Sequence, residues 1–127
     1  MKYIQKITLA IFLFGALSAC KKNGTGGKAD ISATVIHHDH VIPFSTIYIK
    51  YGAKEFPGTN LSNYNDHVTT DKNGHADLSH LRYGDYYLYG VGYDSTIMSP
   101  IGGGDHISIK WSQRKKTLAF TVPVTEI

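Results

Sequence analysis

The sequence predicts an all-β fold, a seven-stranded sandwich, and three observations lead to this fold class. Beyond residue 28, apolar and polar residues alternate at period two, which indicates strands with one buried face. β-branched and aromatic residues are concentrated in these runs, as strands prefer. Seven runs fall within about 100 residues, a spacing typical of two packed sheets, and none has a helical period.

The strands are expected in a simple order along the chain. Their predicted ranges are 31–35, 46–51, 68–70, 76–78, 86–91, 107–111 and 117–124. In the first range Ile31, Ala33 and Val35 share one face, and the longer ranges follow the same pattern. Asp71-Lys72-Asn73-Gly74 separates the third and fourth ranges and predicts a β-hairpin, because an Asn-Gly pair accommodates the positive φ that such a turn needs.

A segment of a different kind precedes this domain. Lys2 and Lys6 stand near the start, residues 7–17 contain one polar side chain, and Ser18 and Ala19 follow. A positive start, a short apolar run and small residues indicate a secretory signal peptide over 1–19. The apolar run is shorter than the roughly 20 residues that span a bilayer. The alternative is a buried N-terminal helix, but such a helix normally has a polar face.

Leu17-Ser18-Ala19-Cys20 resembles the lipobox of bacterial lipoproteins. The resemblance implies that Cys20 is the first residue of the mature protein and that its acyl chains anchor the protein in a membrane. It also accounts for the only cysteine in the chain. The Gly-rich residues that follow predict a flexible tether. The expected organisation is therefore a signal peptide (1–19), a lipidated Cys with its tether (20–28) and one domain (29–127).

The charge of the mature chain argues against nucleic acid as a partner. Removal of Lys2 and Lys6 leaves 11 basic and 10 acidic residues, a net charge of +1. Arg114-Lys115-Lys116 is a short basic run that predicts a solvated turn. Because there is no extended basic stripe, we expect no nucleic-acid binding.

One stretch of the domain resembles a known family. The residues that carry the resemblance follow the order T-D-x-N-G-x-A-x-L-x-x-L-x-x-G-x-Y-x-L, in Thr70, Asp71, Asn73, Gly74, Ala76, Leu78, Leu81, Gly84, Tyr86 and Leu88. This resembles the carboxypeptidase regulatory-like domains, which have a transthyretin-like (prealbumin-like), Ig-like sandwich and are common in small lipoproteins of Bacteroidota. The resemblance implies a non-catalytic module that supports, spaces or docks other proteins. The motif itself describes a turn and core residues, and a fold alone does not give a function.

The sharpest candidate site is the cluster His37-His38-Asp39-His40. If these residues continue a strand, His38 and His40 lie on one face. Two imidazoles on one face are candidate ligands for Zn²⁺, Cu²⁺ or Ni²⁺. His106 is the expected third ligand, with His67 as the alternative, because a metal site needs at least three converging ligands. The competing interpretation is a polar loop that exposes the cluster and binds nothing.

Tyrosines are concentrated between residues 83 and 93. If Tyr86 faces the core, Tyr87, Tyr89 and Tyr93 share the outer face of that strand. Such a face is a candidate site for docking an envelope protein or a glycan, because Tyr combines an apolar ring with a polar tip. The competing interpretation is an ordinary strand with cross-strand aromatic pairs.

No enzyme motif is present: the sequence contains no G-x-S-x-G, H-E-x-x-H or P-loop. We therefore expect a non-catalytic lipoprotein of the cell envelope. The alternative hypothesis is a metal-binding lipoprotein that uses the His cluster, and the third hypothesis is an enzyme. Lys21 stands where lipoproteins retained in the inner membrane carry Asp, which favours the outer membrane. Lys21-Lys22-Asn23 also lacks the acidic residues of surface-exposed Bacteroidota lipoproteins, which favours the periplasmic side.

Overall fold

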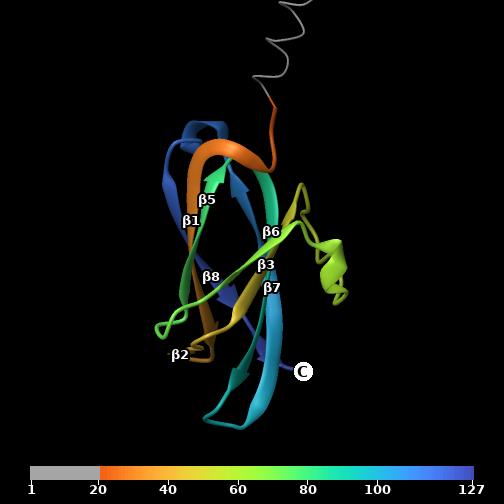
Figure 1. Ribbon diagram of the computed structural model, residues 1–127, viewed down its shortest axis with the longest axis vertical. Coiled ribbons are helices and arrows are strands. Elements are labelled where there is room, and N and C mark those ends of the chain that lie inside the picture. The colour runs from red at the N-terminus through yellow and green to blue at the C-terminus, as the bar shows by residue number, and fades with distance from the viewer. Residues whose placement is uncertain (1–20) are drawn as a thin grey trace, which may run out of the picture.

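The computed structural model describes residues 21–127, and the predicted signal peptide and Cys20 lie outside the described residues. The described chain forms a two-sheet β-sandwich, which confirms the predicted fold class (Figure 1). Seven strands have four or more residues, and two have only two residues. The elements are β1 (Thr25–His37), β2 (His40–Val41), β3 (Thr46–Tyr51), η1 (Leu61–Asn63), β4 (Asp66–Thr69), β5 (His75–Leu81), β6 (Gly84–Asp94), β7 (Ser99–Ile109), η2 (Trp111–Gln113), β8 (Thr117–Pro123) and β9 (Thr125–Glu126).

The two sheets are built around the longest strands. In the first sheet, β1 pairs antiparallel with β5 and β2 and parallel with β8. The second sheet has the order β4-β3-β6-β7-β9, with antiparallel neighbours throughout. Figure 1 shows β1, β5 and β8 forming one layer and β3, β6 and β7 the other. Beyond its two pairs with β9, at Ile101 and Gly102, the outer edge of β7 has no strand partner among the described residues.

The core lies between the sheets and contains the alternating residues that the sequence predicts. Ile31, Ala33 and Val35 of β1 and Ile47 of β3 are fully buried. Burial of a large aliphatic side chain stabilises the fold by roughly 1.5–3 kcal/mol. The remaining buried apolar residues are Ala29, Ile42, Ile49, Leu78, Leu81, Tyr86, Leu88, Tyr89, Ile101, Ile109, Val122 and Val124.

The ordered fold begins earlier than predicted, because residues expected to form a flexible tether belong to the sandwich. β1 begins at Thr25. Asn23 Oδ1 accepts a hydrogen bond from the Asp85 backbone N–H at 2.9 Å, and the Gly24 N–H donates to the Tyr86 hydroxyl at 2.9 Å. Gly84, with φ of 140°, leaves room for Asn23, whose Oδ1 would lie 2.0 Å from a Cβ at this position. The predicted domain boundary at residue 29 is therefore too late.

The turn at Asp71–Gly74 forms, but it does not make the predicted hairpin. The Gly74 N–H donates to the Asp71 carbonyl, and the Asp71 carboxylate accepts the N–H groups of Asn73 and His75 at 2.8 and 3.0 Å. The strands on its two sides then separate, because β4 pairs with β3 and β5 pairs with β1. The turn therefore connects one sheet to the other.

Trp111 also departs from the predicted pattern. It was expected to extend the alternating strand of Ile107 and Ile109, but β7 ends at Ile109 and Trp111 begins the 3₁₀ helix η2. Trp111 is 55% exposed, and its ring lies under the Arg114 guanidinium, with the Arg114 Cζ 4.1 Å from the ring centroid. Among residues 21–127, no helix is long and apolar enough to cross a membrane.

Candidate functional site

A tight hairpin positions the histidine cluster. β1 ends at His37, His38 and Asp39 form the turn, and His40 pairs back with His37 as the first residue of β2. His38 has a φ of +54°, a conformation that non-glycine residues adopt mainly in turns. Because the strand does not continue, the prediction that His38 and His40 share one face is wrong. His37 is instead the buried member, with 1% of its surface exposed.

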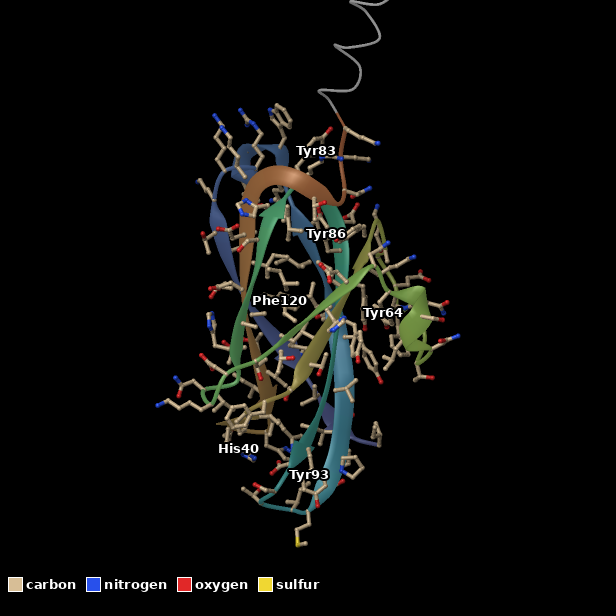
Figure 2. The ribbon with its side chains drawn as sticks, in the orientation of Figure 1. His40, Tyr64, Tyr83, Tyr86, Tyr93 and Phe120 are labelled. Carbon is tan, nitrogen blue, oxygen red and sulfur yellow. The ribbon has the colours of Figure 1, made fainter. Side chains whose placement is uncertain are left out.

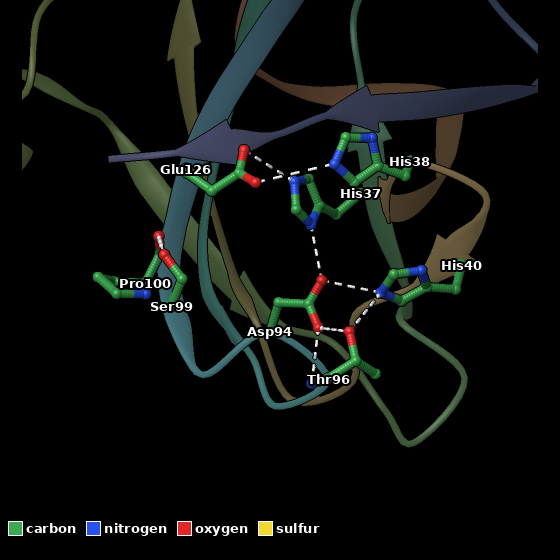
Figure 3. Close-up of polar contacts among 8 residues, drawn as sticks. All are labelled: His37, His38, His40, Asp94, Thr96, Ser99, Pro100 and Glu126. Atoms are coloured by element: carbon green, nitrogen blue, oxygen red, sulfur yellow. Dashed lines mark hydrogen bonds and ion pairs between the residues drawn. The ribbon is translucent and has the colours of Figure 1, made fainter.

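Asp94, at the end of β6, holds this hairpin from the other sheet (Figure 3). Its Oδ2 lies 2.6 Å from His37 Nδ1 and 2.8 Å from His40 Nε2. Its Oδ1 accepts the Thr96 N–H at 2.9 Å and the Thr96 hydroxyl at 2.5 Å. The carboxylate is 1% exposed, and both of its oxygens are therefore satisfied by hydrogen bonds, as burial of a charge requires.

The second nitrogen of His37 faces a different carboxylate. His37 Nε2 lies 3.2 Å from Glu126 Oε2, and His38 Nε2 lies 3.8 Å from Glu126 Oε1. Neither pair is a well-formed hydrogen bond, and the buried His37 Nε2 makes no hydrogen bond among the described residues. A half-exposed Glu126 on β9 thus completes a cluster of three histidines and two carboxylates.

The carboxylates shift the proton equilibria of the cluster. The hydrogen bond to Asp94 raises the pKa of His37, burial opposes this effect, and Glu126 adds to it. The same hydrogen bond from His37, together with the Thr96 hydroxyl, holds the pKa of Asp94 well below its usual range. The pKa of Glu126 is lowered first by its own backbone N–H and then by His37. Each shift favours a cationic imidazole between anionic carboxylates.

These pKa shifts predict a pH dependence of stability for the metal-free protein. The raised pKa of His37 gives stabilisation that is present below pH 6.5, its ordinary value, and is lost as the pH rises through the folded-state pKa. The lowered pKa of Asp94 gives stabilisation that is present above pH 3.8 and is lost in acid. Urea unfolding in EDTA is therefore expected to show the largest difference between wild type and Asp94→Asn between these values. A difference that grew above pH 8 would contradict the assignment.

The structure does not bring His106 to the cluster. His106 lies on β7 opposite Tyr87, and its Nε2 is 3.0 Å from Asp85 Oδ1. It belongs to neither of the two groups of metal-ligating side chains found among residues 21–127. His67, the alternative third ligand, lies on β4 beside Tyr48. Sequence reasoning missed Asp94, Thr96 and Glu126, because no spacing signal links these residues to the hairpin.

The predicted tyrosine face is divided by the structure. Tyr86 is fully buried, so Tyr87 and Tyr89 lie on the outer face as expected. However, Tyr89 is only 6% exposed, because a segment between β3 and β4 covers it. Tyr64 of this segment stacks on the Tyr89 ring at 5.8 Å, and Phe56 contacts it at 5.3 Å. Burial raises the pKa of Tyr64 to about 12.

A groove of about 510 Å³ lies beside these rings. Its lining includes Phe56, Tyr87 and Tyr89, the glycines at 102–104 of β7, and Ile127. Gly104 is required here, because a Cβ at this position would lie 1.9 Å from the Leu88 carbonyl oxygen. Tyr93 lies outside the groove near the opposite end from Tyr83, as Figure 2 shows. We call the depression the aromatic groove.

The end of the sandwich where the described chain begins carries a basic hollow of about 280 Å³. The five charged side chains that line it are all cationic: Lys21, Lys28, Arg82, Arg114 and Lys115. Trp111 and Tyr83 also line it and contact each other edge to face. Every ion pair between described residues involves a histidine, so none of these five cations is neutralised by a carboxylate. We call this surface the basic end.

The fold and these surfaces define the class of the described residues, a small two-sheet β-sandwich domain. The chain is similar in structure to the major pilin subunit of Bacillus cereus, with a TM-score of 0.52, 14% identity, and coverage of 79% of this chain and 30% of that chain. It also matches the minor pilin of Streptococcus agalactiae over 80% of this chain and 44% of that chain, with a TM-score of 0.44 and 18% identity. The chain thus spans less than half the length of either pilin.

This similarity concerns the fold alone. No protein-family model and no curated protein matches the sequence. The relation to carboxypeptidase regulatory-like domains and to bacterial lipoproteins therefore stays a prediction.

Proposed function

We propose that this protein is a non-catalytic lipoprotein of the bacterial cell envelope, anchored through Cys20 and docking a partner protein at the aromatic groove. The observation that carries the docking role is the position of the groove. It lies beside the outer edge of β7, where residues 123–127 cover the edge from Pro100 to Gly103 and where residues 104–109 have no strand partner among the described residues. An open sheet edge next to an apolar groove suits an extended peptide, which pairs its backbone with the edge and places side chains in the groove.

The register of the second sheet supports this mode. Tyr87 and Tyr89 lie on β6, which pairs with the edge strand β7. Tyr89 is opposite Gly104, and Tyr87 is opposite His106. A peptide added beyond β7 would therefore place alternate side chains near these rings. Aromatic rings at the centre of an interface contribute much of its binding energy. A glycan that stacks on Tyr87 and Phe56 is the alternative occupant.

Lipid anchorage is supported by the sequence around Cys20 and by the position of the basic end. Lys21, which follows the predicted anchor directly in the sequence, lines the basic end together with Lys28. Lys and Arg side chains near an anionic membrane surface each contribute about 1 kcal/mol of attraction. We propose the outer membrane, on its periplasmic side, as the location.

Several features support a non-catalytic role. The Thr96 hydroxyl donates to the Asp94 carboxylate at 2.5 Å, whereas His40 Nε2 lies 3.5 Å away, so its short hydrogen bond is to the carboxylate and not to a histidine. The most buried histidine, His37, is 1% exposed and has little access to a substrate. The fold is also similar to part of the major pilin subunit of Bacillus cereus.

Tyr87→Ala and Phe56→Ala are expected to abolish partner capture. The test is in vivo crosslinking of the full chain with a photoreactive residue in place of Thr59, followed by mass spectrometry of the product. Loss of the rings removes the apolar side of the groove, so the crosslinked protein band should disappear in both variants. Tyr93→Ala is the matched control, because Tyr93 is 52% exposed and lies outside the groove.

The identity of the crosslinked product decides between the occupants. A protein band that is lost in the groove variants and kept in Tyr93→Ala supports the proposal. A crosslinked product that only glycan hydrolases degrade would show that the partner is a glycan and not a protein. Equal capture by all variants would show that the aromatic groove is not the docking surface.

A further inference from the structure

We propose that this protein binds one divalent transition-metal ion through His37 Nε2, His38 Nε2 and the Glu126 carboxylate. The site lies where the turn between β1 and β2 meets β9 (Figure 3). None of the three ligands lines the aromatic groove, so this proposal does not rest on docking of a partner there. Two imidazoles and one carboxylate are donors that suit Zn²⁺, Cu²⁺ and Ni²⁺, whereas Ca²⁺ and Mg²⁺ prefer oxygen ligands alone.

The first argument is the unsatisfied nitrogen of His37. With a proton on Nδ1 donated to Asp94 at 2.6 Å, a neutral imidazole carries its lone pair on Nε2. That atom is buried and makes no hydrogen bond among the described residues. Its neighbour at 3.2 Å is Glu126 Oε2, which is also an acceptor. Two acceptors this close need either a second proton on His37 or a metal cation between them, and an ion that binds here would take the place of that proton.

The second argument is the spacing of the ligand atoms. His37 Nε2 and Glu126 Oε2 are 3.2 Å apart, and His38 Nε2 and Glu126 Oε1 are 3.8 Å apart. Ligand atoms around tetrahedral zinc are separated by roughly 3.3 Å, because each bond is about 2.0–2.1 Å long. The ligand atoms of all three residues lie within 4.8 Å of one another. A small movement of the exposed His38 and Glu126 side chains therefore completes the site.

Asp94 serves this site as a positioning residue. Metal-binding histidines usually donate their other ring N–H to a carboxylate, which fixes the tautomer and the ring orientation. Asp94 does this for His37, and it is itself held by His40 and by the backbone N–H of Thr96. The nitrogen that faces Glu126 is thus oriented before any ion binds.

The other candidate group, His37, His40 and Asp94, fits a metal ion less well. Both histidines lie 2.6–2.8 Å from a single carboxylate oxygen, which are hydrogen-bond distances. Asp94 Oδ1 is occupied by Thr96. This group is a closed hydrogen-bond network, whereas the group around Glu126 is open. His38 is 68% exposed and Glu126 51%, so an ion reaches them from solvent, and water takes the fourth position.

The test is calorimetric titration of the full chain, purified in detergent and freed of metal, with ZnCl₂. One ion per chain is expected to bind. His38→Ala and Glu126→Gln should each weaken the affinity by at least roughly tenfold, whereas His106→Ala should change it by less than about threefold. Both substituted ligands are exposed, and melting curves in EDTA will show that these variants keep the fold.

His40→Ala distinguishes the two groups. With the proposed ligands, this variant is expected to retain zinc binding, because His40 contacts Asp94 and lies outside the ligand set. Loss of binding in His40→Ala with full binding in Glu126→Gln would assign the ion to Asp94 instead and overturn the proposal. Absence of saturable binding in the wild-type chain would overturn it as well, and would leave His37 as a protonated bridge between Asp94 and Glu126.

Discussion

Replacement of Tyr86 by Phe is expected to lower the free energy of unfolding by roughly 1–3 kcal/mol, the cost of leaving buried polar groups without partners. The Tyr86 side chain is fully buried and lies near the start of β6, the central strand of the second sheet. Its hydroxyl accepts the Gly24 N–H at 2.9 Å and lies 2.7 Å from the Arg82 carbonyl, to which it donates. The ring of Phe fills the same space, so the effect is that of the lost hydroxyl. Urea unfolding monitored by circular dichroism measures it.

The same variant tests how the start of the domain is held. Without the hydroxyl, the Gly24 amide is expected to lose its protection from hydrogen exchange, and amides in the middle of β3 should keep theirs. Tyr93→Phe is the matched control, because Tyr93 lies on the same strand and is 52% exposed. If both variants unfolded at the same urea concentration as wild type, residues 23–28 would be attached by other contacts.

Replacement of Cys20 by Ser is expected to abolish attachment of the lipid completely. A lipoprotein with two or three acyl chains is held durably, because each buried CH₂ contributes about 0.8 kcal/mol. Serine cannot form the thioether, so incorporation of radiolabelled palmitate should disappear and the export signal should stay uncleaved. Labelling of cells that express each form, followed by fractionation, measures both effects.

The domain itself should be unaffected by this change, since Cys20 precedes every strand and the described residues contain no other cysteine. Circular dichroism of the Cys20→Ser chain is therefore expected to match wild type. Palmitate labelling that persisted in the variant would disprove lipidation at this position, and a signal peptide cleaved at another residue would replace the lipobox prediction.

Local patterns placed a strand segment in each predicted range but missed the start of β1 and the first half of β7, because alternation reports burial residue by residue and the glycines of β7 give no such signal. Ile31, Ile47 and Tyr86 face the core as their spacing indicated. The turn at Asp71–Gly74 was also correct as a turn, since its hydrogen bonds are local. Whether its flanking strands share a sheet depends on contacts with β1 and β3, and no local signal reports those.

The candidate site was predicted only in part, for the same reason. The sequence indicated residues 37–40 as a candidate site. The predicted positions of the side chains were wrong, however, because they assumed that the strand continues through these residues. A turn at His38 reverses the chain and buries His37 instead. Asp94 and Glu126 meet this hairpin from distant positions. Likewise, Phe56 reaches Tyr89 through a loop that carries no periodic signal.

The early start of β1 has a mechanical consequence for an anchored protein. Because Asn23 and Gly24 are fastened to Asp85 and Tyr86, only Lys21 and Lys22 separate the predicted lipid from the rigid body. A linker of two residues would leave the domain little rotational freedom. It would also keep the basic end in contact with the lipid headgroups. His40 and Tyr93 would then point away from the bilayer, at the far end of the long axis (Figure 2). The long axis of the sandwich would then stand roughly perpendicular to the membrane. The cluster of His37, His38 and His40 would lie at the end farthest from the bilayer, at a fixed distance from it.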